Sequence, residues 1–301
     1  MFPSFLTTLL FSFSVIFASR SAKVLGGPAA NLARLMLALV ALGVWAHGFG
    51  GGLRGPALPW LLAGGVIGFG FGDMCLFGAL TRIGPRLSIL LTQCLAAPIA
   101  ATVEWRWLGK AMAPAEALCA ACILAGVALA LAPDHGTEGK RSTFWLGVLF
   151  GIGSALGQGL GAVFTRKAYI VSDAAGFAID GGTAAYQRIV GGAIITWITF
   201  FIMRKVHPES HRLPDSAAWR KAAPSVLGNA AAGPACGVAC FQWALRTAES
   251  GIVLPIVATS PIVTMLLAWF LDGARPARRA VLGGLIAVCG AVALNVVRTR
   301  S

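Results

Sequence analysis

The chain has 301 residues, of which 57% are hydrophobic and only 12% are charged, and its formal net charge is +13. Charged residues make up about a quarter of soluble domains, so the composition excludes an ordinary soluble protein and indicates a membrane protein. The Lys and Arg residues lie mainly between apolar runs, as in the loops of membrane proteins. The positive charge therefore does not indicate nucleic-acid binding.

Long apolar runs recur along the whole chain. A hydrocarbon core of about 30 Å needs roughly 20 apolar residues per spanning helix. By this criterion the sequence predicts an all-α integral membrane protein with ten transmembrane helices, at residues 3–19, 29–47, 59–81, 87–108, 114–132, 144–165, 183–203, 221–245, 251–271 and 279–297.

The first two predicted spans carry few charges. The first, FPSFLTTLLFSFSVIFAS, has no Lys or Arg before Arg20. A secretory signal normally begins with positive charge, so we expect a retained helix. Arg34 stands near the start of the second span, as Arg188 does in the seventh, where the neighbouring Tyr186 is a further candidate for gating. Long side chains near helix ends reach toward the interface. We therefore expect both arginines to snorkel or to pair at a gate, with binding of an anionic substrate as the other interpretation.

The third span contains Asp73, an acidic residue deep within an apolar run. An ionisable group inside a membrane segment indicates function or a buried partner. Asp73 is therefore either protonated, paired with Arg34 or Arg188, or turned toward water in a transport path. Its two candidate roles are a coupling carboxylate and a member of a structural ion pair.

The fourth span holds Ser88, Thr92 and Gln93 ahead of Pro98, and Glu104 at its end. Polar groups inside a membrane face the bundle interior or a functional site, so the first three are candidate substrate ligands. Glu104 is followed by the sequence Trp-Arg-Trp, which resembles an interfacial anchor belt. We expect Glu104 to be structural and to lie at the membrane boundary.

The fifth and sixth spans are rich in small residues. The fifth contains the pair CAAC at 119–122, which we interpret as buried packing residues rather than a redox motif. Small residues let membrane helices approach closely, so the sixth and third spans are predicted to pack inside the chain, with a dimer face as the alternative. The glycines concerned are Gly147, Gly151, Gly153, Gly157 and Gly161, together with Gly64, Gly68 and Gly72.

Polar residues of the second half occupy similar positions. The sixth span has Ser154 and Gln158 four residues apart. We add the polar residues of the eighth and ninth spans to the candidate substrate ligands. They are Asn229, Gln242, Trp243, Thr259 and Ser260. Serine and threonine often bond their own helix, whereas amides need more partners.

Pro98 and Pro261 stand in matching apolar runs, in the fourth and ninth spans. Proline removes a backbone donor and frees a carbonyl of the preceding turn. In a bilayer this carbonyl needs a partner from another helix, a hydroxyl or a cavity water. We predict that both prolines break their helices and face the protein interior.

The two halves of the sequence resemble each other in order. AANLARL (29–35) matches TAAYQRI (183–189), APIAA (97–101) matches SPIVT (260–264), and AGVAL (125–129) matches GAVAL (290–294). We predict one five-helix repeat at 1–132, a connecting loop at 133–143 and a second repeat at 144–301. Five helices per half invert the second half, which is the arrangement of carriers that open alternately to each side.

With these features the chain resembles the EamA-type branch of the drug/metabolite transporter superfamily. The family often has Leu-Gly-Glu and a basic residue after the fourth and ninth helices, where this chain reads LGKA (108–111) and LDGA (271–274). The resemblance implies a carrier of small metabolites, often an exporter, with a cavity lined by helices 1, 3, 4, 6, 8 and 9. It also implies a proton-linked, gradient-linked or facilitative mechanism.

The predicted function is therefore secondary transport of a small polar or amphipathic metabolite, such as an amino acid or amine, across the plasma (inner) membrane. The sequence predicts no enzyme activity, no cofactor and no metal site, because it lacks the motifs of these chemistries. The alternatives are an intramembrane lipid-modifying enzyme and a membrane scaffold. Expected partners are the substrate, membrane lipid and a proton or other coupling ion, with a monomer or homodimer as the assembly.

The orientation of the chain stays open. With the termini inside, eight basic residues face the cytoplasm, whereas with the termini outside the number is 15. The positive-inside rule favours the second arrangement, and the family resemblance implies the first. An inverted repeat fits either orientation.

Overall fold

The structure is a computed structural model that describes residues 1–109, 112–131, 141–206, 214–272 and 278–300. These residues form helices and contain no strand. The helices are α1 (Phe2–Leu25), α2 (Gly27–Gly48), α3 (Leu58–Gly65), α4 (Asp73–Leu108), α5 (Pro114–Leu131), α6 (Arg141–Ala174), α7 (Gly181–Val206), α8 (Ser216–Ala230), α9 (Cys236–Thr247), α10 (Ser250–Val257), α11 (Ser260–Asp272) and α12 (Arg278–Arg300), with π-helical segments η1 (Val66–Gly72) and η3 (Ala231–Ala235).

Several helices are long and apolar enough to cross a membrane. Among the described residues there are five, at Phe2–Leu25, Gly27–Gly48, Leu58–Leu76, Thr143–Ala174 and Gly181–Val206. Shorter apolar helices lie at Pro114–Leu129, Ser250–Thr264 and Val281–Leu294. The all-helical, multi-pass membrane class is therefore confirmed. The count of ten crossings stays a prediction, as do the repeat boundaries, and most of the predicted loop 133–143 lies outside the described residues.

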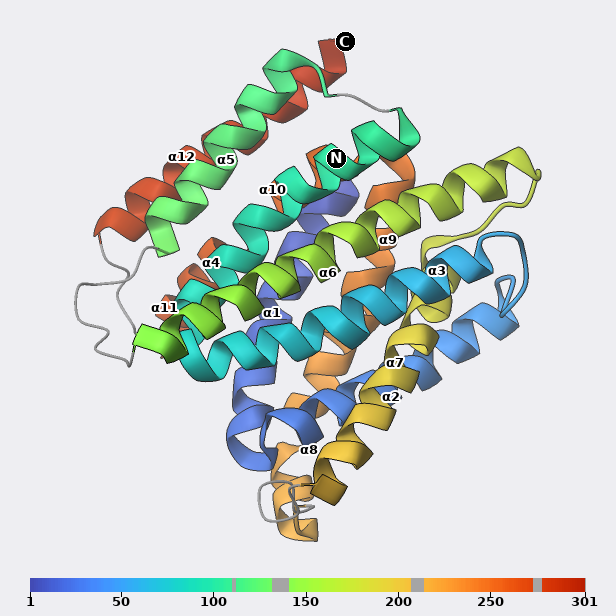
Figure 1. Ribbon diagram of the computed structural model, residues 1–301, viewed down its shortest axis with the longest axis vertical. Helices are drawn as coiled ribbons and strands as arrows, with labels where there is room; N and C mark the ends of the chain where they lie inside the picture. The colour runs from blue at the N-terminus through green and yellow to red at the C-terminus, as the bar shows by residue number, and fades with distance from the viewer. Residues whose placement is uncertain (110–111, 132–140, 207–213, 273–277, 301) are drawn as a thin grey trace.

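The chain from α3 to the end of α4 reverses its direction beside α6. From Gly72 to Ile83 the contacted residue numbers on α6 fall, because Gly72 lies against Gly157 and Ile83 against Gly147. From Leu91 to Ala96 they rise again, because Leu91 lies against Gly151 and Ala96 against Gly159. The reversal falls between Ile83 and Leu91, and the backbone stays helical through it (Figure 1). The predicted spans 59–81 and 87–108 are thus two legs of one helical run.

Pro98 does not interrupt its helix, so the predicted break there is wrong. Helix α4 continues through this residue to Leu108, and Pro98 is exposed rather than turned inward. The carbonyl of Pro98 accepts a hydrogen bond from Thr102 Oγ1 at 2.8 Å. The carbonyl that Pro98 frees is the one a turn earlier, and in a membrane helix neighbouring groups and local adjustments can satisfy such a carbonyl without a break.

Near Pro261 the helix is interrupted, at Ala258 and Thr259 between α10 and α11. The carbonyls at this interruption find hydroxyl donors on α1. Thr8 Oγ1 donates to the Ile256 carbonyl at 3.2 Å, and Ser12 Oγ donates to the Ser260 carbonyl at 2.9 Å. Buried carbonyls in a membrane need such partners, so α1 stabilises the broken helix.

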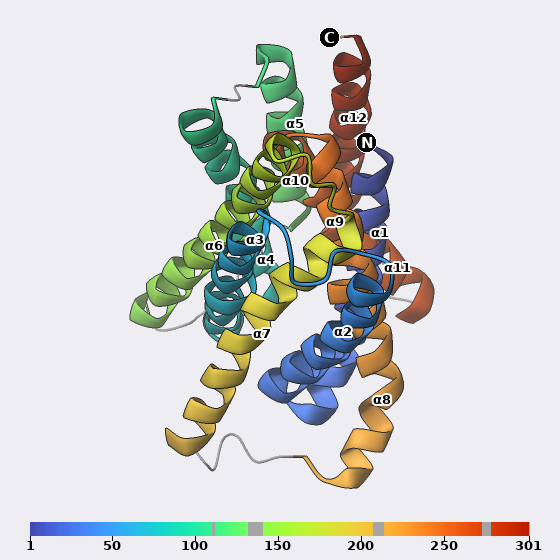
Figure 2. The same cartoon turned by 90° about the vertical axis from the view of Figure 1, so that its right-hand side faces the viewer.

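Packing between the halves is reciprocal. Helix α1 contacts α8, η3, α9 and α11, whereas α6 contacts α3, η1 and α4. Helices α2 and α7 contact each other, as do α5 and α12, which lie side by side at one edge of the bundle (Figure 1). Figure 2, turned by 90°, shows α8 at the far end of the molecule from the paired α5 and α12. The first helix of each predicted half therefore packs on the third and fourth helical runs of the other predicted half.

Glycine ridges bring α6 close to α3 and η1. A Cβ at Gly157 would lie 2.5 Å from Gly72 Cα, and one at Gly161 would lie 3.2 Å from the Gly64 carbonyl oxygen. The two ridges predicted from the sequence thus pack against each other within one chain. This contact sets the backbone spacing around the polar residues described next.

Candidate functional site

Arg188 of α7 lies buried at the centre of the bundle. Only 5% of the residue is exposed. Its Nη1 donates to Thr165 Oγ1 and Gln242 Oε1, each at 3.3 Å. Its guanidinium carbon lies 5.5 Å from the ring centroid of Phe69 and 5.9 Å from that of Phe241. The expectation that Arg188 snorkels to the interface is wrong, because aromatic faces and hydroxyl and amide acceptors hold its charge inside the protein.

Asp73 begins α4 directly after η1 and faces Arg34 of α2. The ion pair joins Asp73 Oδ2 and Arg34 Nη2 at 3.5 Å, and the side chains are 20% and 21% exposed. Arg34 Nε donates to Asn31 Oδ1 at 2.7 Å, which fixes the guanidinium. Asp73 also interacts electrostatically with Arg188. The predicted pairing of Asp73 with an arginine is therefore present, and it links α2, α4 and α7.

The two predicted amides of helices α4 and α6 meet. Gln158 Nε2 donates to Gln93 Oε1 at 2.9 Å, across the contact between the predicted halves. Three hydroxyl residues of the same two helices are buried: Ser88, Thr92 and Ser154. Among the described residues Thr92 Oγ1 is buried without a hydrogen-bond partner. The geometry brings donors and acceptors of both halves to one contact.

The predicted polar residues of the later helices fall in different surroundings. Asn229 is buried and its Oδ1 accepts from Ser14 Oγ of α1 at 2.8 Å. Thr259 and Ser260 are buried and donate to carbonyls of α10. Trp243, by contrast, is 45% exposed and packs edge-on against Phe2, with ring centroids 6.3 Å apart. Trp243 therefore does not join the buried polar residues beside its neighbour Gln242.

The predicted gating residue Tyr186 contacts α2 near the end of the bundle. Its hydroxyl lies 3.2 Å from His47 Nε2, and the rings meet edge-on at 5.3 Å. Nearby, Asp180 lies just before α7 and accepts from Trp45 Nε1 at 2.9 Å. Burial alone would raise the pKa of Asp180, but hydrogen bonds from Thr183, Trp45 and Gly182 outweigh it and lower that pKa. Charged Asp180 thus joins the start of α7 to α2.

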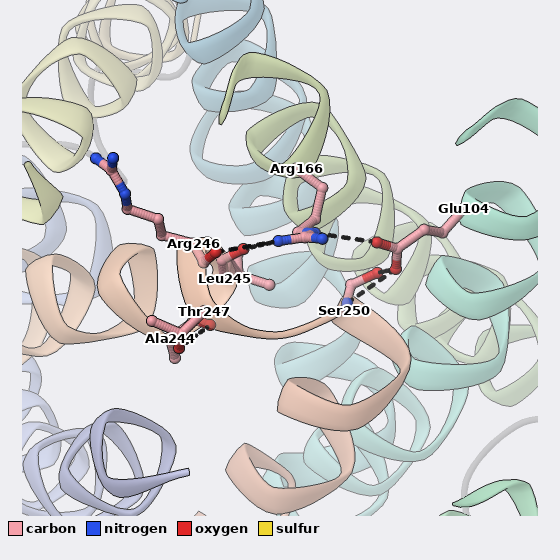
Figure 3. A network of polar contacts seen from close by, with 7 residues as sticks. All are labelled: Glu104, Arg166, Ala244, Leu245, Arg246, Thr247 and Ser250. Carbon is pink, nitrogen blue, oxygen red and sulfur yellow. Dashed lines mark hydrogen bonds and ion pairs between the residues drawn. The ribbon is translucent and has the colours of Figure 1, made fainter. Parts of the chain in front are cut away.

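Glu104 is buried inside the protein, with 1% of the residue exposed, and its contacts are structural, as predicted, while its expected place at the membrane boundary stays a prediction. Its Oε1 pairs with Arg166 Nε at 3.2 Å, and its Oε2 accepts from the backbone N and Oγ of Ser250. Arg166 Nη1 donates to the Leu245 carbonyl at 2.6 Å (Figure 3). The Glu104 carboxylate thereby caps the start of α10, and the Arg166 guanidinium caps the end of α9. Each charge is opposite in sign to the helix end that it contacts.

Sequence reasoning missed several residues of these contacts. Thr165 and Phe241 surround Arg188, Ser14 bonds Asn229, and Arg166 pairs with Glu104. Thr165 is the last residue of the predicted sixth span and Arg166 directly follows it, yet α6 continues to Ala174. The sequence signal for Thr165 and Arg166 was their position as two adjacent polar residues at the end of a long apolar run. Its partners lie far away in sequence and only the fold brings them together.

Comparison with known proteins adds the following. The model of the family described as "EamA-like transporter family" matches residues 145–296. No curated protein matches the chain in sequence. A solved crystal structure, described only as that of a protein, is similar with a TM-score of 0.73 over 99% of this chain and 97% of that chain, at 19% sequence identity. At this identity the likeness concerns the fold alone.

Proposed function

Because this chain belongs to the EamA-like transporter family, whose members are membrane transporters of the drug/metabolite type, we propose that it carries a small polar or amphipathic metabolite by alternating access. Export across the plasma membrane is the direction and place that we propose. The observation that carries the proposal is the Gln158–Gln93 contact, which joins α6 and α4 across the predicted halves. A solute between these helices would meet amide and hydroxyl groups of both halves.

Reciprocal packing supports the alternating-access part of the proposal. The first helix of each predicted half lies on the third and fourth helical runs of the other half. In an inverted repeat each half can take the conformation that the other half leaves, around a site near the midplane. The π-helical segments η1 and η3 stand at corresponding positions of the two halves, in the third helical run of each. Such segments often occur at functional sites.

Flux measurements with purified protein in liposomes test this function. We expect accelerated uptake of at least one amino acid, amine or related solute. In Gln158→Ala the flux should fall about tenfold, because Gln93 loses its donor and a hydrogen-bond partner is worth about 1 kcal/mol or more. Thr102→Ala is the matched control, because Thr102 is exposed and bonds only its own helix.

The same preparation separates the alternative functions. If a broad panel of solutes showed no accelerated flux while a modified lipid accumulated in the liposomes, the lipid-modifying enzyme would replace the carrier. Neither flux nor product from well-folded protein would favour a scaffold. A C-terminal fluorescent or phosphatase fusion in cells decides the orientation.

A further inference from the structure

One edge of the buried Arg188 guanidinium makes no hydrogen bond with the described residues. Both hydrogen bonds that the described residues make with this side chain end on Nη1. Nε is buried and has no hydrogen-bond partner among the described residues. The N–H groups of Nε and Nη2 point in one direction and form the fork that grips a carboxylate with two parallel hydrogen bonds. The fork is therefore available to a ligand.

Glycines and aromatic rings shape the space around this fork. A Cβ at Gly68 would lie 2.8 Å from Nη2, and a Cβ at Gly161 would lie 2.4 Å from it. Any larger residue at either position would press on this edge of the guanidinium. Phe69 and Phe241 lie over the guanidinium group. Because the rings cover the guanidinium, a ligand would have to bind at its edge, in the plane of the group.

Among the described residues, Arg188 also has no counter-ion of its own. Asp73 lies within its electrostatic reach, but the ion pair of Asp73 in this structure is with Arg34. The acceptors on Nη1, Thr165 and Gln242, are neutral. Two cations thus share one carboxylate in this cluster of Arg34, Asp73 and Arg188. A buried cation without compensation is costly, and a bound anion would remove that cost.

We propose that Arg188 binds the carboxylate of the transported solute, so that the substrates are small organic acids or amino acids rather than amines. This inference rests on the proposed carrier function and names the substrate class of the same site. Arg188 thereby changes from a gating candidate to the residue that recognises the substrate. The carboxylate takes the Nε–Nη2 edge, and Thr165 and Gln242 hold the opposite side of the guanidinium in place.

The test compares acids with their uncharged amides on the wild-type protein in detergent. Three pairs serve as probes: acetate and acetamide, benzoate and benzamide, and N-acetylalanine and N-acetylalaninamide. We expect at least one acid to raise the melting temperature and to bind about tenfold or more tightly than its amide, because hydrogen bonds to charged groups are the stronger ones. If no acid exceeded its amide, or if chloride or phosphate alone stabilised the protein as much, the proposal would be wrong.

Variants locate the site. In Arg188→Gln the preference for the acid should disappear, and in Arg188→Lys it should weaken, because an ammonium lacks the planar fork. Gly68→Ala should also weaken the preference for the acid, although Arg188 keeps its charge in this variant. Arg204→Gln, in the last turn of the same helix, is the matched control and should leave the preference unchanged. An unchanged preference in folded Arg188→Gln would overturn the proposal. If that variant does not fold, Gly68→Ala and the wild-type series decide the matter.

Flux assays with the same probes keep the two proposals apart. Acid-selective binding without flux of any solute would reject the carrier and leave the anion site in place. Flux of amines or amides with no preference for acids would reject the anion site and leave the carrier.

Discussion

Glu104 and Arg166 illustrate how a single buried pair can hold several helices. The pair bridges α4 and α6, and through Ser250 and Leu245 it reaches α10 and α9. Neither side chain is more than 12% exposed. Removing one member of a buried pair leaves the other charged and uncompensated, which costs about 3 to 5 kcal/mol.

We therefore predict that Glu104→Gln lowers the apparent melting temperature strongly and reduces the monodisperse yield in detergent. The double variant Glu104→Gln with Arg166→Gln should lose less than the sum of the single variants, because the buried charge disappears. Asp173→Asn is the control: its ion pair with Arg246 is at the surface, with Asp173 62% exposed, and such pairs contribute about 0 to 1 kcal/mol. Equal losses in Glu104→Gln and Asp173→Asn would contradict this interpretation.

At the residue scale the sequence predicted which polar residues are buried, but it did not predict the partners that hold them there. It identified Gln93, Gln158, Asn229 and Gln242 from their placement in apolar runs, and all four now have protein partners. It misplaced Arg188, because nearness to a helix end along the chain does not reveal that Phe69 and Phe241 cover that end. The partners of a buried charge come from distant segments, and one sequence does not contain that pairing.

At the scale of helices, close approach depends on glycine at a few positions. Gly157 is the clearest, since a Cβ there would meet the backbone of Gly72 at 2.5 Å and the Ile67 carbonyl oxygen at 2.9 Å. Backbone atoms cannot rotate away as a flexible side chain can. An added methyl group must therefore separate α6 from η1.

We predict that Gly157→Ala destabilises the protein by about 1 to 3 kcal/mol, the usual cost of overpacking. Gly48→Ala is the matched control, because a Cβ at Gly48 meets nothing within 4 Å and the residue ends α2. Thermal unfolding in detergent, followed by tryptophan fluorescence, compares the two variants. A Gly157→Ala protein as stable as Gly48→Ala would show that the helices separate without cost.

The apolar runs predicted the helices well, because hydrophobic length is what a membrane selects. The predicted spans lie on the observed helices. The predicted helix break is present near Pro261 but not at Pro98. Pro98 lies within unbroken α4, whereas Pro261 follows the interruption between α10 and α11. At the interruption before Pro261, Thr8 and Ser12 of α1 donate hydrogen bonds to carbonyls of the broken helix. Donors from another helix are invisible to a local pattern.

At the scale of the whole molecule, Asp73 occupies the place where charge can couple the two halves. It follows η1 in the first half, pairs with Arg34 of α2, and lies in the field of Arg188 on α7 of the second half. Glu104 is engaged by Arg166 and Ser250. Asp73 Oδ2, in contrast, is buried and accepts no hydrogen bond from the described residues. Of these two carboxylates, Asp73 is thus the one that we predict to exchange a proton during the proposed transport.

We therefore predict that solute flux in wild-type liposomes responds to an imposed pH gradient, and that Asp73→Asn removes this response while leaving some gradient-independent flux. The amide keeps the shape of the side chain but holds a fixed, neutral state, so Arg34 and Arg188 no longer gain or lose a counter-charge. Asp173→Asn, at the surface, should respond as the wild type does. A response to the pH gradient that survives in Asp73→Asn would place proton coupling at another residue. If the wild type shows no response, the protein works by facilitated diffusion, and the Arg34–Asp73 pair serves only to hold α2 against α4.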